Sequence, residues 1–437
     1  MPLPLPRLRS FASSLKQRLQ SPRASIAAAS AASVTVAAAT AAATNMSSSE
    51  GGPITISLSK RQIGQGELSR RAVEGAALSE QDIHEVIKAH LSRLQTKYHA
   101  NFDRFEANTG TKHPLDKRTA ACSSERKDEG TTPLTSQEGN QLWTGEVAIG
   151  TPPVRVPLDF DTGSSDLFVT PGLYHPDRSS TCEKTGKRFG TGFGDGTHAE
   201  GDIYLEDVTV GGLTAHKQAV GNATKSTLDD EGSKGIAGMA FQKISSFNAP
   251  SFIATLIHQS SLAQPVFGFG LWADKDARLD LGHIPQNVFK GDLVWNKADS
   301  ASGFWAVDFE ISHVEGRQVG MVDTGTTLIV GPKADVKAML LAAGMTIKEQ
   351  DGQIYGVYRA DAPTPELALT FNGTRFPISA DALLYQKHGD LLVAGIVGSD
   401  FWDEGITWVL GDTLLRDVYA VFKQDGEQAE VGFAPKA

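Results

Sequence analysis

The chain has 437 residues, of which 40% are hydrophobic and 21% are charged, and its formal net charge at pH 7 is −10. This length is enough for two sizeable hydrophobic cores with accessory segments, so a single compact domain is not expected. Residues 1–118 hold 16 of the 41 Lys and Arg and 9 of the 51 Asp and Glu, which leaves 25 basic and 42 acidic residues for positions 119–437. Such an acidic body argues against a nucleic-acid-binding protein.

Residues 1–49 contain no acidic side chain, and five basic residues precede an uncharged stretch from Ala24 to Thr44. A basic start, a weakly apolar middle and small residues near Ala41 are typical of a secretory signal peptide, which is the interpretation we favour for residues 1–44. A signal anchor and an organelle transit peptide are the alternatives that the composition leaves open. The favoured interpretation predicts a protein that is secreted, or delivered to a vacuole, through the secretory pathway.

A helical pattern follows within residues 45–118. Ser79-Glu-Gln-Asp82 has the form of a capping box, and apolar residues recur at helical spacing from Ile83 to Tyr98. This pattern predicts a helix over about residues 80–103, whose apolar face must dock on another part of the chain. An extended stretch at residues 53–60 precedes the helix and predicts a strand.

The basic leader ends at the dibasic pair Lys117-Arg118, which lies in a polar linker that runs to about Pro133. Secretory processing proteases cut at such pairs, so we interpret Lys117 and Arg118 as the processing site. From Leu134 onward, short apolar runs alternate with Gly, Pro, Asn and Asp, which predicts a mainly β body. The best helical segments in this body are residues 251–259 and 333–343.

Two copies of one motif organise the body. Asp161-Thr-Gly-Ser follows an apolar run, and Asp323-Thr-Gly-Thr repeats the pattern further along the chain. The interval between the two aspartates is the size of a whole domain, so each half of a duplicated body would contribute one carboxylate. Two carboxyl groups about 3 Å apart cannot both ionise, so one stays protonated while the other acts as a base. Such a pair can activate a water molecule for attack on a peptide carbonyl without a metal or cofactor.

Residues 158–168 and 322–328 resemble the two active-site motifs of the pepsin-like aspartic endopeptidases, and most closely the fungal branch typified by penicillopepsin and endothiapepsin. Similar stretches lie, in the family's order, at residues 145–153, 194–197, 235–241 and 408–415. The resemblance implies a mainly β, two-lobed acid protease fold with a central cleft, preceded by a helical propeptide. The expected organisation is a targeting segment at 1–44, a propeptide at 45–118, an N-terminal lobe at 119–300 and a C-terminal lobe at 301–437.

The activity that this resemblance implies is hydrolysis of internal peptide bonds at acidic pH, by a water that Asp161 and Asp323 activate. Polypeptides would be the substrates, and no cofactor, metal or nucleic acid is implied. The alternative is a pepsin-fold binding protein with weak or lost catalysis, but damage to one motif is then expected and both are intact. No sequence signal for an oligomer is visible, and we expect a monomer.

Supporting roles follow from the same resemblance, residue by residue. Thr162 and Thr324 would brace the two loops through mutual hydrogen bonds. Ser164 and Thr326 would donate to the outer carboxylate oxygens, while Gly163 and Gly325 would offer backbone amides. The flap that closes over the substrate would contain Phe193, Gly194, Asp195 and Thr197.

The flap departs from the family pattern at two positions. Phe193 stands where relatives usually have Tyr, and Phe168 stands where they have the Trp that this Tyr hydrogen-bonds. Asp195 resembles the flap Asp of fungal enzymes that tolerate a basic residue before the scissile bond, and a solvated turn residue is the alternative. Because Phe193 and Phe168 both lack the polar group of the Tyr and Trp they replace, we expect a flap that closes by apolar packing of Phe193.

Lys97-Tyr98 resembles the Lys-Tyr pair that reaches over the active site in pepsin-type zymogens, so the propeptide is expected to act as an intramolecular inhibitor. An exposed Lys beside a packing Tyr is the alternative. Cys122 and Cys182 are the only cysteines, and they could form a disulfide or remain two free thiols. The sequons at Asn222 and Asn372 are glycosylation candidates if the chain is secreted.

Overall fold

The computed structural model describes residues 56–57, 79–113, 130–136, 143–192, 198–226, 233–272, 277–399, 408–426 and 428–437. All of these belong to one unit, Gly51–Ala437. The targeting segment, the processing pair Lys117-Arg118, Cys122 and the flap residues Phe193, Gly194, Asp195 and Thr197 lie outside the described residues.

Helix α2 (Glu80–Thr109) confirms the predicted helix and its start. The Ser79 hydroxyl accepts from the backbone N–H of Asp82 at 3.1 Å, and the Asp82 carboxylate accepts from the backbone N–H of Ser79 at 2.8 Å, which is a complete capping box. The predicted end near residue 103 was wrong, because the helix continues to Thr109. Its buried side continues with Phe105, and Gly110 ends the helix in the left-handed conformation, with φ 69°.

The half that carries Asp161 is built mainly from antiparallel strand pairs, with two parallel pairs among its own strands. Strand β4 pairs antiparallel with β3 and parallel with β9, which brings Gly238 beside Asp161. Strand β5 lies between β8 and β9. The strands are β2 (Gly130–Ser136), β3 (Trp143–Ile149), β4 (Val154–Asp161), β5 (Leu167–Val169), β6 (Glu183–Gly192), β7 (His198–Val210), β8 (Leu213–Ser226) and β9 (Gly235–Gly238).

The half that carries Asp323 repeats this arrangement. Strand β14 pairs antiparallel with β13 and parallel with β22, which places Leu410 opposite Val322. Strand β15 lies between β21 and β22. The strands are β13 (Ala306–Ile311), β14 (Gln318–Val322), β15 (Ile329–Gly331), β16 (Thr346–Gln350), β17 (Gln353–Arg359), β18 (Ala368–Phe371), β19 (Thr374–Pro377), β20 (Leu384–His388), β21 (Leu391–Gly398) and β22 (Trp408–Leu410).

A third group of strands connects the two halves. Strand β23 pairs with β10 on one side and with β24 on the other, and β24 also pairs with β12. The short strand β1 (Ile56–Ser57) confirms the predicted strand at these two residues, and it lies between β2 and β11. The remaining strands are β10 (Val266–Gly270), β11 (Arg278–Leu281), β12 (Val294–Ala298), β23 (Val418–Asp425) and β24 (Gln428–Pro435).

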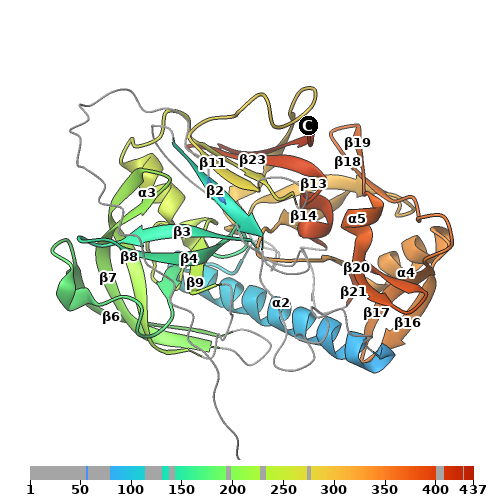
Figure 1. Ribbon diagram of the computed structural model, residues 1–437, viewed down its shortest axis with the longest axis horizontal. Coiled ribbons are helices and arrows are strands. Elements are labelled where there is room, and N and C mark those ends of the chain that lie inside the picture. Colours follow the sequence, from blue (N-terminus) through green and yellow to red (C-terminus); the bar gives the residue numbers. More distant parts are fainter. Residues whose placement is uncertain are drawn as a thin grey trace, which may run out of the picture. The chain divides into compact units, whose positions relative to one another are not determined.

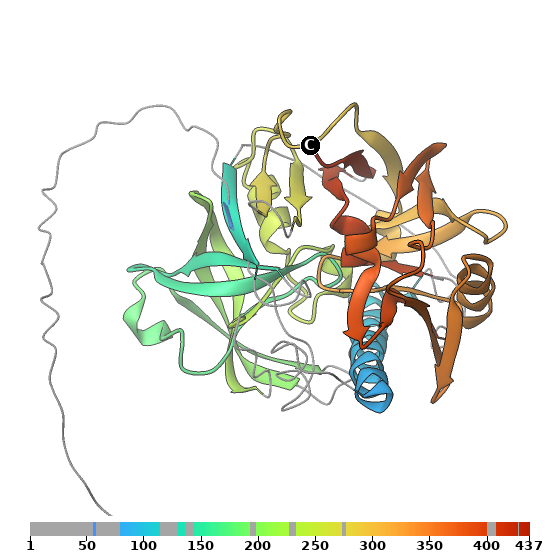
Figure 2. The ribbon, with the colours of Figure 1, turned by 45° about the vertical axis from the view of Figure 1, so that its right-hand side comes forward.

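Few helices interrupt this mainly β body, as the sequence predicted. Helices α3 (Phe252–His258) and α4 (Lys333–Ala342) confirm the two segments predicted as helical. Figures 1 and 2 show α4 at the outer side of the strands, whereas α2 passes along the strands of both halves. Shorter helical turns are α5 (Ala380–Leu383), α6 (Asp412–Leu415), Pro176–Arg178, Gln242–Ile244 and Ser300–Ser302.

The apolar side of α2 is part of a hydrophobic core rather than a surface. Its buried residues form one cluster with Phe304, Val357, Val393 and Val409 of the second half. Burying one such side chain contributes about 1.5–3 kcal/mol, so six of them hold the helix firmly against the body. The α2 residues in this cluster are Ile83, Ile87, Leu91, Leu94, Tyr98 and Phe105.

Candidate functional site

The two Asp loops meet at the ends of their strands, and both carboxylates are buried, with 3% exposure for Asp161 and 0% for Asp323. Each loop has a glycine where the opposite aspartate approaches. A Cβ atom on Gly163 would lie 2.6 Å from Cγ of Asp323, and one on Gly325 would lie 2.3 Å from Oδ1 of Asp161. No larger residue fits at either position, which explains the glycine of each motif.

Two threonines link the loops across the junction between the halves. The backbone N–H of Thr162 donates to the Thr324 hydroxyl at 3.0 Å, and the N–H of Thr324 donates to the Thr162 hydroxyl at 3.0 Å. The Thr162 hydroxyl in turn donates to the carbonyl of Val322 at 2.9 Å, and that of Thr324 donates to the carbonyl of Phe160 at 2.6 Å. Each threonine is therefore bonded to the strand that leads into the opposite aspartate.

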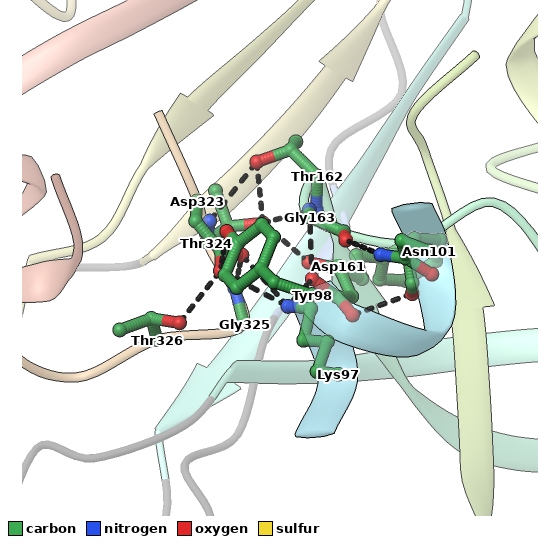
Figure 3. Close-up of polar contacts among 12 residues, drawn as sticks. Lys97, Tyr98, Asn101, Asp161, Thr162, Gly163, Asp323, Thr324, Gly325 and Thr326 are labelled. Atoms are coloured by element: carbon green, nitrogen blue, oxygen red, sulfur yellow. Dashed lines mark hydrogen bonds and ion pairs between the residues drawn. The ribbon is translucent and has the colours of Figure 1, made fainter. Parts of the chain in front are cut away.

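Each carboxylate accepts hydrogen bonds from one backbone N–H and one hydroxyl group of its own loop (Figure 3). For Asp161, the Gly163 N–H donates to Oδ1 at 2.8 Å, and the Ser164 hydroxyl donates to Oδ2 at 2.5 Å. For Asp323, the Gly325 N–H donates to Oδ1 at 3.0 Å, and the Thr326 hydroxyl donates to Oδ2 at 2.6 Å. These bonds fix the planes of both carboxylates before any substrate binds.

Helix α2 brings three further side chains to the pair (Figure 3). The Lys97 ammonium donates to Oδ1 of Asp161 at 2.7 Å and to Oδ2 of Asp323 at 3.0 Å. The Tyr98 hydroxyl donates to Oδ2 of Asp323 at 2.8 Å. The Asn101 amide donates to the carbonyl of Gly163 at 2.9 Å. The sequence pattern had singled out Lys97 and Tyr98 but missed Asn101, although it lies one helical turn after Lys97 and hence on the same face of the helix.

These contacts set the charge state of the site. Burial lowers the pKa of Lys97, but the two carboxylates outweigh burial and raise its pKa overall. Burial raises the pKa of Asp161, and Asp323 adds to this effect while Lys97 opposes it. For Asp323, burial alone would raise the pKa, but Lys97 and the hydrogen-bond donors around its carboxylate lower the pKa overall. The two carboxyl groups are thus driven in opposite directions, as expected for a close pair.

The helix leaves almost no open space above the pair. The cavity beside Asp161 has a volume of about 30 Å³ and is lined in part by His90, Leu94, Lys97 and Thr326. Two helical turns after Lys97, the Arg104 guanidinium donates to the hydroxyl of Thr191 in β6 at 2.9 Å. A peptide cannot enter while α2 is in place.

The other predicted residues have varied surroundings. Phe168 is buried and contacts Phe189, with ring centroids 5.9 Å apart. The Cys182 thiol is free in this structure, and its candidate partner Cys122 lies outside the described residues, so the choice between a disulfide and two free thiols stays a prediction. Asn222 lies within β8, and its side-chain oxygen is buried without a hydrogen-bond partner. Asn372, by contrast, is exposed in the turn between β18 and β19.

No group of three or more His, Cys, Asp and Glu side chains within the described ranges is arranged to hold a metal ion. No helix in the part of the chain that the structure describes is both long enough and apolar enough to span a membrane.

Comparison with known proteins gives one consistent result. The sequence model of the family described as "Eukaryotic aspartyl protease" matches residues 142–436. Secreted aspartyl protease 1 of Malassezia globosa is 32% identical over 356 residues, which cover 80% of this chain and 88% of that protein. Rhizopuspepsin-1 of Rhizopus niveus is 30% identical, covering 70% of this chain and 82% of that protein.

The crystal structure of the aspartic proteinase from Irpex lacteus has a similar fold, with a TM-score of 0.61 and 21% identity, covering 71% of this chain and 98% of that one. The mainly β body agrees with this likeness. The chain therefore belongs to the eukaryotic aspartyl protease family, and it is a pepsin-like aspartic endopeptidase of the fungal type.

Proposed function

We propose that Asp161 and Asp323 form the catalytic dyad and that the enzyme hydrolyses internal peptide bonds of polypeptides at acidic pH. One observation carries this assignment. The two carboxylates come from separate copies of the repeated motif, yet both lie within hydrogen-bonding distance of the same ammonium, at 2.7 Å and 3.0 Å from Nζ of Lys97. Groups that share one small cation are close enough to share one proton and one water molecule when that cation leaves.

In the open enzyme, a water molecule takes the place of the ammonium between the carboxylates. The ionised carboxylate removes a proton from this water as its oxygen attacks the peptide carbonyl carbon. The protonated carboxyl donates a hydrogen bond to the carbonyl oxygen as it gains negative charge, and the tetrahedral intermediate forms. Transfer of a proton to the amide nitrogen then allows the C–N bond to break. Neither step needs a cofactor.

The supporting residues keep the roles expected of them in this proposal. Gly163, Ser164, Gly325 and Thr326 orient the two carboxylates, and the pairing of Thr162 with Thr324 keeps the loops in register across the two lobes. The flap of Phe193, Gly194, Asp195 and Thr197 covers the bound peptide, with Phe168 packed beneath it. We place the lobe boundary near residue 300.

The unprocessed chain is proposed to be a zymogen whose propeptide, residues 45–118, inhibits it. Lys97 neutralises the dyad, Tyr98 covers Asp323 and the α2 backbone occupies the position of the substrate. The helical backbone itself protects the inhibitor from cleavage, since its peptide groups are bonded within the helix and are not presented in an extended form. Cleavage after Lys117-Arg118 then gives a mature chain that begins close to Thr119.

We further propose that the enzyme acts outside the cell as a monomer after removal of residues 1–44, with a vacuole as the alternative destination. The relative named as a secreted aspartyl protease supports the extracellular location. The exposed turn position of Asn372 makes it the better glycan acceptor of the two sequons, because Asn222 has a buried side-chain oxygen in a strand. N-terminal sequencing of the secreted protein tests the processing site, and a mature N-terminus upstream of Ile54 would contradict it.

The decisive test of the activity is hydrolysis of denatured haemoglobin or casein at pH 3 to 5, with and without a statine-type transition-state mimic. Asp161→Asn and Asp323→Asn should each remove nearly all turnover and leave the fold intact. Asp177→Asn, which changes an exposed aspartate, is the matched control. If either dyad variant kept more than about a tenth of the wild-type kcat, a barrier increase below about 1.4 kcal/mol, the dyad assignment would be wrong. Loss of all activity in the wild type itself would favour the binding-protein alternative.

A further inference from the structure

Two tryptophans occupy matching places in the duplicated body. Trp143 and Trp305 stand at the same interval before the two aspartates of the dyad, Asp161 and Asp323. Each tryptophan is 1% exposed. Trp143 begins β3, which pairs with β4, and Trp305 directly precedes β13, which pairs with β14. Each indole therefore lies beside the strand that leads into the aspartate of its own half.

Each indole N–H donates to an acceptor in the other half. The Trp305 indole donates to the carbonyl of Met239 at 3.1 Å, which follows β9 in the half of Asp161. The Trp143 indole donates to Oδ2 of Asp412 at 3.2 Å, which follows β22 in the half of Asp323. The duplication has thus produced two reciprocal contacts, and each crosses from one half to the other.

Both acceptors are bonded directly to an aspartate loop. The backbone N–H of Met239 donates to the carbonyl of Asp161 at 2.8 Å, and the N–H of Asp412 donates to the carbonyl of Thr326 at 2.8 Å. The Thr326 hydroxyl then donates to Oδ2 of Asp323 at 2.6 Å. A Cβ atom on the neighbouring Gly411 would lie 2.1 Å from the carbonyl oxygen of Thr326, so this segment is pressed against the loop. Movement of either acceptor must therefore move the loop beside it.

We infer that Trp143 and Trp305 are positioning residues that hold the aspartate loop of the opposite half, so that the dyad geometry depends on two hydrogen bonds across the molecule. The inference rests on the proposed role of Asp161 and Asp323. A buried N–H that loses its acceptor is costly, so each bond resists separation or rotation of the halves. Catalytic groups must be held closely to the productive geometry, and small misplacements cost large factors in rate.

The two indole contacts differ in the kind of acceptor. The acceptor for Trp305 is a backbone carbonyl, which no substitution removes, whereas the acceptor for Trp143 is the carboxylate of Asp412, which is 1% exposed. The matching position in the first half is Met239, with no carboxylate. The Trp143–Asp412 contact can therefore be examined from both sides by mutation.

The first experiment compares Trp143→Phe and Trp305→Phe with Trp272→Phe in the full-length chain, assayed in acid after its own maturation. Trp272 is also buried, at 4%, but it packs in a separate cluster with Tyr419. The active molecules are counted with a tight-binding statine-type inhibitor. We expect kcat per active molecule to fall at least about fivefold for Trp143→Phe and Trp305→Phe, with KM within about twofold of the wild-type value and no change for the control.

A purely structural role gives a different pattern. It would lower the urea midpoint of all three variants and leave kcat per active molecule unchanged, and that result overturns the inference. If the wild type and the Trp272→Phe control are active and the other two are equally active, only this inference fails. An inactive wild type would instead contradict the proposed function.

The second experiment keeps the inference testable if the tryptophan variants do not fold. Asp412→Ala removes the acceptor and should lower kcat about tenfold, whereas Asp412→Asn retains an acceptor oxygen and should recover most of that loss. Adding Trp143→Phe to Asp412→Ala should cost less than about twofold more, since both changes remove the same bond. Equal kcat values for Asp412→Ala and the wild type would refute the positioning role of Trp143.

Discussion

The ammonium of Lys97 lies 2.7 Å from Oδ1 of Asp161, although the two belong to distant parts of the sequence. The contact is buried, since the side chains are 8% and 4% exposed. Removing one partner of a buried ion pair typically costs about 3–5 kcal/mol, because the remaining charge is left without compensation. The latency of the unprocessed chain should therefore depend strongly on this one side chain.

Lys97→Met should make the unprocessed chain active. Methionine fits the space but leaves two buried carboxylates without their cation, so docking of α2 weakens. In a chain whose processing is blocked by Arg118→Ala, we expect peptide hydrolysis at pH 5 to rise at least about tenfold. Lys112→Met, which removes the same charge from an exposed position, is the control and should leave the chain latent. A Lys97→Met chain as latent as the control would show that the ammonium is not required.

Acid should release α2 from the body. The hydrogen bond and charge of Lys88 lower the pKa of Asp351, and the pKa of Asp323 is also lowered in the docked state, against the effect of burial. A carboxyl group with a lowered pKa stabilises the docked state above its ordinary pKa of 3.8 and loses this effect as the pH falls through the lowered value. The raised pKa of Asp161 acts the other way, since its protonation favours the docked state.

Hydrogen exchange of the Asp161→Asn chain measures this release, because that substitution removes both self-cleavage and the opposing carboxyl group. The amides of α2 should lose protection as the pH falls below about 3.8, the ordinary pKa of both carboxyl groups, while the strands of the body stay protected. Lys97 stays charged throughout, since its pKa is raised. Equal protection of α2 at pH 7 and pH 3 would contradict the proposed acid release.

The paired threonines should stabilise the fold as one unit. Thr162→Val and Thr324→Val keep the shape of the side chain but remove hydroxyls that bond to backbone groups of the opposite loop. Each should lower the free energy of unfolding by about 1–3 kcal/mol, and the double variant should lose less than the sum of the two. Urea denaturation measures both quantities, and Thr346→Val at an exposed position is the control. Fully additive losses would show that the two hydroxyls act independently.

Phe193 should shield the dyad from water. Phe193→Ala is expected to lower kcat/KM at least about tenfold, because the ring of the flap would be lost. Phe193→Tyr combined with Phe168→Trp should exceed the sum of the single effects by about 0.5–1.5 kcal/mol if the hydrogen bond usual in the family is restored. The stability of the variants that carry Phe168→Trp must also be measured, because the Phe168 ring already packs against Phe189. If Phe193→Ala left kcat/KM unchanged and the effects of Phe193→Tyr and Phe168→Trp simply added, the flap would lie elsewhere in the sequence.

The parts of this fold that could be predicted are those with a local or repeated signal. The Asp-Thr-Gly repeat predicted a body of two halves, and the family-like stretches at residues 235–241 and 408–415 contain the strands that pair beside the two aspartates. The start of α2 was evident from its capping box. Its end was not found, although Gly110 is a helix-ending residue, because the decisive contact of Phe105 is with the distant residues of the body.

Other features depend on how distant segments meet. Nothing local to Asn101 indicates that its amide reaches Gly163, and nothing local to Trp143 indicates an acceptor at Asp412. The equal spacing of Trp143 and Trp305 before their aspartates is a signal that a search for repeats could have found. Such a search gives the equivalence of two positions but not the partner that either one contacts.

The continuous helical form of α2 also determines how much chain becomes available when it unwinds. Its 30 residues rise about 1.5 Å each as a helix, or about 45 Å in total, but span up to about 100 Å when extended. When the helix unwinds, the segment can therefore span roughly 50 Å more than it does as a helix. A tether of that length lets the released segment, with the Lys117-Arg118 pair beyond it, travel far from the cleft or return to it as an extended strand. In the zymogen that we propose, the transition that opens the enzyme would thereby also supply its first accessible peptide.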